Sequence, residues 1–264
     1  MDQQSLVGAE LLGGAIIVIL NWLSEKIKLL PMVDLVVKPT KRSELVFKAD
    51  AKAEGTDVSV GGFALGPDMS TMNAKWFAYD LTPENAQWAF IKEGQAFRTI
   101  SSLELFASLL CVMLFGGIAR GPLNLSITCI TDNQGNDALI RKNMTTKFPL
   151  FLILIELVEQ LEKQGVILEL IWQRRELNQD ADDLTNKKFC NFNPELRMCP
   201  NLSDLPWIIL PRLFDDAACL FARIADVRAA VKAKKVLKGN GLSSLKPKRF
   251  KKAKKAGLRV THPW

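Results

Sequence analysis

Four acidic residues, far apart in the chain, each stand at the edge of a predicted structural element. Asp50 closes an apolar, β-favouring run that begins at Leu45, so we expect it to end a strand. The other three acids are Glu104, Asp132 and Asp182. Because α/β folds place their chemistry at the rim of the sheet, we expect the four carboxylates to meet in one cleft and to hold divalent metal.

The chemistry of such a cleft follows from its residue types. Hard Mg²⁺ prefers oxygen ligands, which Asp and Glu supply. Carboxylates gathered without a cation would repel one another and raise one another's pKa, so a metal is a natural reason to assemble them. Two ions ~4 Å apart can activate water and stabilise the leaving oxygen of an in-line displacement. The only histidine, His262, lies at the end of the chain, which removes histidine-based triads and multi-histidine metal sites.

Each acid taken singly also has an ordinary structural explanation. Asp50 could terminate a turn, and Glu104 stands three residues after Ser101 in a capping-box arrangement. Asp132 could cap a helix, and Asp182 could favour a helix N-terminus. It is the order and setting of the four together that favour a shared metal site.

The elements that must position the acids follow from the hydrophobic pattern. The spacing predicts three antiparallel strands, a buried helix that carries Glu104, a buried strand that ends before Asp132, two helices, a strand and a last helix near Ala181. Such an order implies a mixed sheet with helices on its faces. The predicted strands are Leu45–Asp50, Val58–Leu65, Lys75–Leu81, Leu125–Thr131 and Val166–Trp172, and the predicted helices are 100–117, one ending near Lys142, and Pro149–Glu162 closed by Gly165.

The acids lie in four short motifs that follow one another along the chain. These motifs are Phe47-Lys-Ala-Asp-Ala51 with the glycine pair 61–62, Ser102-Leu-Glu-Leu105, Thr131-Asp-Asn133 and Asn178-x-x-Ala-Asp-x-Leu-Thr185. In this order they resemble the ribonuclease H domain of retroelement (retrotransposon) reverse transcriptases, and the resemblance covers about 44–190.

The resemblance implies a ribonuclease H-like α/β fold, with three antiparallel strands followed by parallel β-α-β units in one five-stranded sheet. It also implies two divalent ions, normally Mg²⁺ with Mn²⁺ possible, and cleavage of the RNA strand of RNA–DNA hybrids. By position, Asp50 would bridge both ions, Glu104 and Asp132 would hold one side, and Asp182 the other. No polymerase-type Y-x-D-D motif occurs, so the chain looks like a portion detached from the polymerase part.

Several residues near the acids are candidate substrate contacts. Asn133 and Gln134 could read a ribose 2′-hydroxyl, although helix capping is an ordinary role for Asn133. Many members of the resembled family carry a histidine before the last acid, whereas this chain has Arg174 and Arg175 there. These arginines could contact phosphate or simply be solvated, and turnover could be slower without the histidine. Asn178, which opens the last motif, completes the set.

The charge of the chain favours an anionic partner. The formal net charge is +7 and the isoelectric point about 9.2. Much of the excess lies between Lys232 and Arg259, which contains no acid. Sequence-independent phosphate binding, nuclear localisation or a plain solubilising tail would each explain this run. Its candidate nucleic-acid contacts are Lys248, Arg249, Lys251 and Lys252.

We expect four segments: an N-terminal hydrophobic helix and linker (1–43), the ribonuclease H-like domain (44–190), an extension with an amphipathic helix (191–239) and a basic, disordered tail (240–264). The helix expected over 211–238 could pack on the domain or pair with a second copy, because its apolar residues are spaced alternately four and three. Five cysteines without a C-x-x-C, and no signal peptide, indicate an intracellular protein, nuclear or cytoplasmic and not secreted. The apolar run Leu11 to Leu23 is too short to span a bilayer comfortably, so we expect no membrane partner.

Two other functions fit the same sequence. A catalytically degenerate retroelement relic would only bind nucleic acid, through its basic tail. Another nuclease or an integrase-like enzyme of the same fold would cleave DNA.

Overall fold

The computed structural model describes residues 13–29, 41–67, 69–90, 95–117, 125–142, 145, 147–211 and isolated helical positions between 219 and 233. Most of the linker that precedes residue 41, most of the helix expected over 211–238 and the whole basic tail lie outside the described residues.

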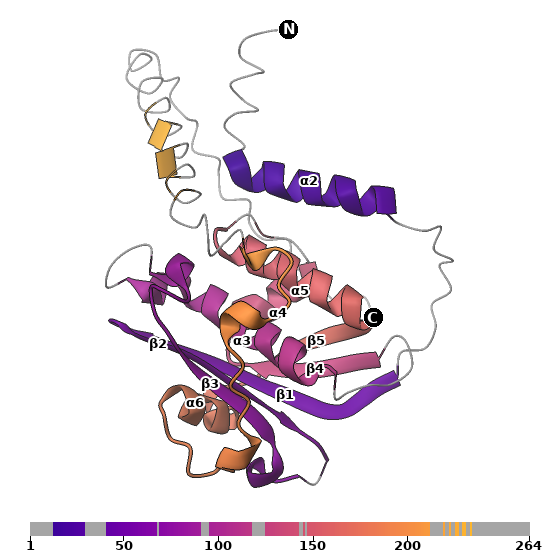
Figure 1. Ribbon diagram of the computed structural model, residues 1–264, viewed down its shortest axis with the longest axis vertical. Coiled ribbons are helices and arrows are strands. Elements are labelled where there is room, and N and C mark those ends of the chain that lie inside the picture. Colours follow the sequence, from indigo (N-terminus) through magenta and orange to yellow (C-terminus); the bar gives the residue numbers. More distant parts are fainter. Residues whose placement is uncertain are drawn as a thin grey trace, which may run out of the picture.

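A five-stranded sheet in the order β3-β2-β1-β4-β5 forms the centre of the protein (Figure 1). The first three strands pair antiparallel, and β4 and β5 continue the sheet in parallel. The mixed sheet confirms the predicted ribonuclease H-like fold class. Its strands are β1 (Lys41–Glu54), β2 (Asp57–Leu65), β3 (Lys75–Leu81), β4 (Leu125–Thr131) and β5 (Val166–Trp172).

Strand β1 is longer than its apolar run predicts, and Asp50 does not end it. The strand continues to Glu54 because β2 pairs with it along its whole second half, from Asp50↔Gly61 to Glu54↔Asp57. Gly55, with φ of 60°, supplies the left-handed conformation that the tight turn between the two strands requires. What does end near Asp50 is the pairing with β4, whose last registered pair is Lys48↔Ile130.

Helices cover both faces of the sheet. Figure 1 shows α3 (Ile100–Phe115), α4 (Gln134–Lys142) and α5 (Leu150–Gln164) on one face and α6 (Gln179–Thr185) on the other. The glycine pair lets helices approach from both sides. A Cβ on Gly61 would lie 2.8 Å from Leu184 Cβ of α6, and one on Gly62 would lie 2.6 Å from Cys111 Sγ of α3. The two helices that carry Glu104 and Asp182 therefore rest directly on β2.

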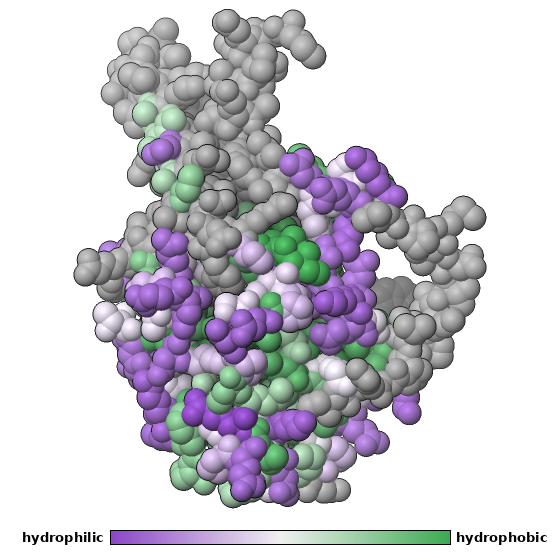
Figure 2. Space-filling model, in the orientation of Figure 1, coloured by the Kyte–Doolittle hydropathy of each residue, from purple (hydrophilic) through white to green (hydrophobic). Residues whose placement is uncertain are grey.

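The main hydrophobic core lies between the sheet and α3. Among the described residues, the segment Ala96–Phe115 is the one helical stretch long and apolar enough to cross a membrane, and 67% of it is buried inside the protein. Its side chains pack against the sheet and α5. Trp76 and Trp88 are also buried. On the face drawn in Figure 2, hydrophilic residues lie along the flanks, and hydrophobic residues reach the surface between them.

Helix α2 (Gly13–Leu29) packs on α5 through one face only. Trp22 Nε1 donates to Glu159, and Lys26 forms ion pairs with Glu159 and Glu162. Leu20 and Ile27 of the same helix are exposed.

The segment after α6 runs along the free edge of the sheet and then crosses to α5. Met198 N donates to Trp76 O at 2.7 Å, and Tyr79 OH donates to Pro200 O at 2.8 Å, so the edge of β3 is covered. The segment ends on Glu156 of α5, which is completely buried. Its carboxylate accepts the backbone N–H groups of Ile208, Ile209 and Leu210 and the side-chain amide of Gln160.

Replacing Glu156 by Gln should destabilise the protein by about 2 kcal/mol, because an amide would turn a donor toward buried N–H donors. The matched change Glu162→Gln, at an exposed ion pair on the same helix, should cost less than about 1 kcal/mol. Urea unfolding measures both, and hydrogen exchange should show faster exchange at the amides of Ile208–Leu210 in the first variant. Equal losses of stability in the two variants would contradict this role of Glu156.

Candidate metal centre

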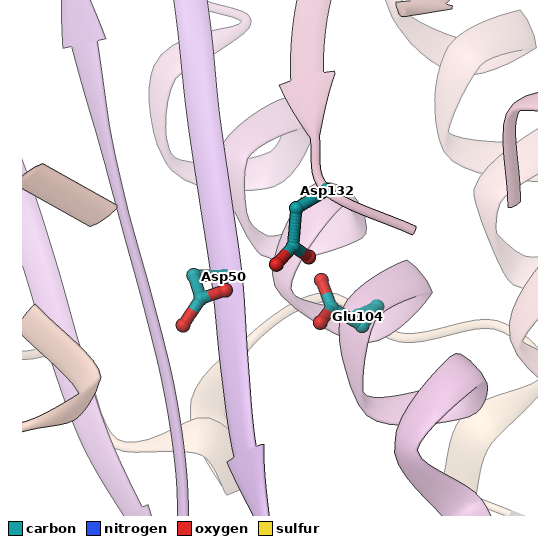
Figure 3. Close-up of side chains that lie close together, drawn as sticks. All are labelled: Asp50, Glu104 and Asp132. Atoms are coloured by element: carbon teal, nitrogen blue, oxygen red, sulfur yellow. The ribbon is translucent and has the colours of Figure 1, made fainter. Parts of the chain in front are cut away.

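Three of the four predicted acids converge. Asp50, Glu104 and Asp132 each offer a carboxylate oxygen, and these oxygens lie within 4.8 Å of one another. Figure 3 shows the three side chains pointing toward a common centre from β1, from helix α3 and from the end of β4. Asp50 and Glu104 are each only 4% exposed, while Asp132 is half-buried. The cluster is thus open to solvent mainly on the side of Asp132.

The geometry of the sheet explains why the acids can meet. Strand β1 runs on past Lys48, where its pairing with β4 stops, so Asp50 lies on a stretch of β1 that β4 does not cover. Asp132 follows the last residue of β4 and faces the same gap. Glu104 is the fifth residue of α3, which begins at Ile100 after the N-cap Thr99, so the capping box proposed with Ser101 does not form.

Neutral donors hold the carboxylates of two of the acids and the backbone of the third. Thr185 Oγ1, on α6, donates to Asp50 Oδ2 at 2.7 Å. Thr131 Oγ1 donates to Glu104 Oε2 at 3.3 Å. Trp172 Nε1 donates to the backbone oxygen of Asp132 at 3.0 Å, which fixes the turn that carries this acid. The two threonines lie inside the motifs that carry the resemblance, but their roles were not predicted; the spacing of Thr185, one helical turn after Asp182, is the signal that could have found it.

Burial and neighbouring charges raise the pKa values of Asp50 and Glu104. Burial raises the pKa of Asp50 to about 7, with further increases from the charges of Asp132 and Asp182; the hydrogen bond from Thr185 and the charge of Arg175 act in the opposite direction. Burial, followed by the charges of Asp50 and Asp132, raises the pKa of Glu104 well above its ordinary value. Asp50 and Glu104 are therefore harder to ionise than free carboxylic acids, and a cation placed between them would lower both pKa values.

Asp182, the fourth predicted acid, is near the cluster but is held by other groups. It lies on α6, on the opposite face of the sheet from α3, and its charge reaches Asp50. Arg175 pairs with its Oδ1, and Asn186 Nδ2 donates to its Oδ2 at 2.9 Å. The structure thus joins three of the acids in one site and leaves the fourth beside them, bound to an arginine.

The predicted substrate contacts have different environments. Asn133 accepts the N–H of Asn136 through its Oδ1 at 3.2 Å, which is the capping role, while Gln134 is exposed beside it. Arg174 and Arg175 are exposed. Asn178 is 1% exposed, and its Nδ2 donates to Ala49 O at 3.0 Å, so it ties the start of α6 to β1. The predicted contacts Lys248, Arg249, Lys251 and Lys252 lie outside the described residues.

A basic pocket lies at the start of the helix that carries Glu104 and was not predicted from the sequence. It has a volume of about 310 Å³ and lies where the first turn of α3 meets α4. Asn136 Nδ2 donates to Ser101 O at 2.9 Å and joins the two elements at the pocket. Its charged lining residues come from three separate segments, so no charge run in the sequence signals it: Arg98, Lys142 and Lys147.

No family model and no curated protein sequence matches this chain. Similar solved structures include ribonuclease H1 from the halophilic archaeon Halobacterium salinarum NRC-1, with 15% identity and a TM-score of 0.39 over 56% of this chain and 97% of that one. LC11-RNase H1, solved in complex with an RNA/DNA hybrid, has 15% identity and a TM-score of 0.39 over 54% of this chain and 94% of its own. Native prototype foamy virus protease-reverse transcriptase has 17% identity and a TM-score of 0.36 over 58% of this chain and 21% of the viral chain.

Asp50 should make the stability of the metal-free protein depend on pH. Its pKa is about 7 in the folded protein and near 3.8 when unfolded, so the folded state keeps a proton that the unfolded chain has released. The stabilisation is complete below about pH 4 and is lost as the pH rises toward about 7, by up to about 1.4 kcal/mol per pH unit.

Urea unfolding in the presence of a chelator measures this contribution as the difference between the wild type and Asp50→Asn. Between about pH 5 and about pH 7 the free energy of unfolding of the wild type should fall relative to that of the variant. Saturating Mg²⁺ should remove the fall. A difference that stays constant with pH would show that Asp50 ionises normally.

Proposed function

We propose that this chain is a metal-dependent endonuclease that hydrolyses the RNA strand of RNA–DNA hybrids. The observation that carries the proposal is the convergence of three carboxylates from β1, α3 and the end of β4 within 4.8 Å. They occur on a sheet of the predicted ribonuclease H-like class and in the order along the chain that the motifs imply.

The donor set fits hard divalent cations. All three groups are carboxylates, and two of them are buried with raised pKa values and with neutral donors as their hydrogen-bond partners. Asp50, Glu104 and Asp132 would hold the first ion, and Asp50 with Asp182 would hold the second; Mg²⁺ is the expected metal and Mn²⁺ a substitute. Bound there, divalent ions would supply an activated water and would stabilise charge on the leaving oxygen.

The chain's own residues prepare this site. Thr185 and Thr131 hold the Asp50 and Glu104 carboxylates in fixed orientations, and Trp172 holds the backbone at Asp132. Groups that hold metal ligands in place typically contribute about 10- to 100-fold to metal affinity or activity. No histidine occurs in this part of the chain, so a carboxylate or water must carry the protons.

The basic pocket supports nucleic acid as the substrate. Arg98, Lys142 and Lys147 surround a cavity at the helix that carries Glu104, and such groups neutralise backbone phosphates without reading sequence. The tail lysines and arginines would add further salt-sensitive contacts.

We also propose an origin in a retroelement reverse transcriptase. The four ordered motifs support this origin. The location in the nucleus or cytoplasm and the segment boundaries given above remain predictions.

The purified chain should cleave the RNA strand of a hybrid duplex in Mg²⁺ and stop when the metal is chelated. Asp50→Asn and Asp132→Asn should each lower the cleavage rate by at least about 10²-fold, because loss of a direct ligand should exceed the effect of its supporting groups. The exposed acid Asp204, changed to Asn, is the matched control and should leave the rate unchanged. Gel analysis of a hybrid labelled on each strand measures the outcome.

Three results would overturn the proposal in different ways. Activity that survives both substitutions would place the chemistry elsewhere. Cleavage of DNA with the RNA strand intact would favour integrase-like work. Hybrid binding without cleavage would favour the degenerate relic.

The basic pocket gives a separate prediction. Changing Arg98, Lys142 and Lys147 together to Gln should weaken hybrid binding and lower the slope of log K against log salt by about 0.7–0.9 for each phosphate that is no longer neutralised. The same charge removed at Lys28, Lys75 and Lys163, which are exposed and do not line the pocket, should change the slope less. Fluorescence anisotropy over a salt series measures both. Identical slopes in the two triple variants would exclude the pocket as a phosphate site.

A further inference from the structure

Asp182 differs from the other three acids because it already has a cation of the chain's own. Arg175 Nη2 pairs with its Oδ1, and the Asp182 side chain is 10% exposed. Among the described residues, no arginine or lysine forms an ion pair with Asp50, Glu104 or Asp132, and threonine hydroxyls donate to the first two. One acid is therefore neutralised while its three neighbours are not.

The remaining oxygen of Asp182 is also occupied. Asn186 Nδ2 donates to Oδ2 at 2.9 Å, and Gln179 Nε2 donates to it at 3.3 Å. Both oxygens thus have partners from the chain, and a metal ion at Asp182 would have to displace at least one of them. Arg175 is the partner that can leave most easily, because its side chain is 67% exposed and its charge can be solvated outside the site.

The guanidinium also acts on the rest of the cluster. Its charge lowers the pKa of Asp50, against the larger effect of burial. Hydrogen bonding to Asp182 raises the pKa of Arg175, and the charges of Asp50 and Asp132 add to the increase. The positive charge of Arg175 thus acts on Asp182, Asp50 and Asp132.

We propose that Arg175 competes with the second divalent cation for Asp182, so that the two ions load in unequal steps. This inference rests on the proposed metal-dependent function. The first ion binds to Asp50, Glu104 and Asp132 without displacing any cation. The second must replace Arg175 at Asp182, which weakens its binding and frees the guanidinium at the mouth of the site.

Titration of the metal-free full chain with Mn²⁺ alone, followed by calorimetry and by the electron paramagnetic resonance signal of free Mn²⁺, tests the inference without any activity assay. The wild type should bind one ion tightly and one weakly. Arg175→Gln should tighten the weak step by about fivefold, the factor expected for an exposed ion pair. Arg174→Gln removes the same charge one residue earlier and should leave the ratio of the two steps as in the wild type.

Two further variants isolate the competition. In an Asp182→Asn background, Arg175→Gln should give no tightening of the second step, because the contested carboxylate is gone. Arg175→Lys keeps the charge and should leave the second step weaker than Arg175→Gln does, which separates competition from a folding defect.

The outcomes separate this inference from the proposed function. If the wild type binds Mn²⁺ at the three-acid cluster but Arg175→Gln leaves the second step unchanged, the competition is wrong and the nuclease proposal stands. If Arg174→Gln tightens the second step as much as Arg175→Gln, general charge and not the pairing with Asp182 is responsible, and the inference is overturned. If neither protein binds Mn²⁺, both proposals fall together.

Discussion

Repulsion between carboxylates that cannot move apart is the constraint on which this site depends. Asp50 is fixed by the pairing of β1 with β2, and Glu104 by a helix that is buried almost all round. Such groups are costly to ionise together without a counter-charge, and the described part of the chain supplies threonine hydroxyls to the two buried ones instead. The convergence of three acids at this cost is the main physical support for the proposed cation site.

The sheet also brings together acids from its two opposite faces, Glu104 on α3 and Asp182 on α6. Helices α3 and α6 lie on different sides, and close approach at Gly61 and Gly62 brings both onto β2. The pairing of β1 with β4 stops two residues before Asp50, so a side chain from the α3 side reaches the same point as Thr185 from the α6 side. The acids therefore meet where the pairing between β1 and β4 ends, and not in a cleft between domains.

Much of this arrangement could be predicted from the sequence, and the misses have physical causes. The strands β3, β4 and β5 match their predicted bounds, because burial on both faces or regular turn residues mark them clearly. The end of β1 was missed because pairing with β2, and not local hydrophobicity, extends it past Asp50. Asn178 is buried because it contacts Ala49, which is distant along the chain. The ion pair between Arg175 and Asp182 depends on side-chain geometry. Spacing along the chain encodes neither of these. For the same reason the basic pocket, assembled from three segments, has no linear pattern.

Hydrogen bonds join the acidic site to the basic pocket. Asn133 and Asn136 follow Asp132 closely, and both donate to Ser101 in the turn of α3 that precedes Glu104. These hydrogen bonds would therefore set the position of a phosphate at Arg98 or Lys142 relative to the carboxylates of Glu104 and Asp132. Opposite charges side by side would ordinarily neutralise each other through ion pairs. Here the three clustered acids form none with the pocket's cations among the described residues, so both sets are available for the partners of the proposed function, a cation for the acids and a phosphate backbone for the pocket.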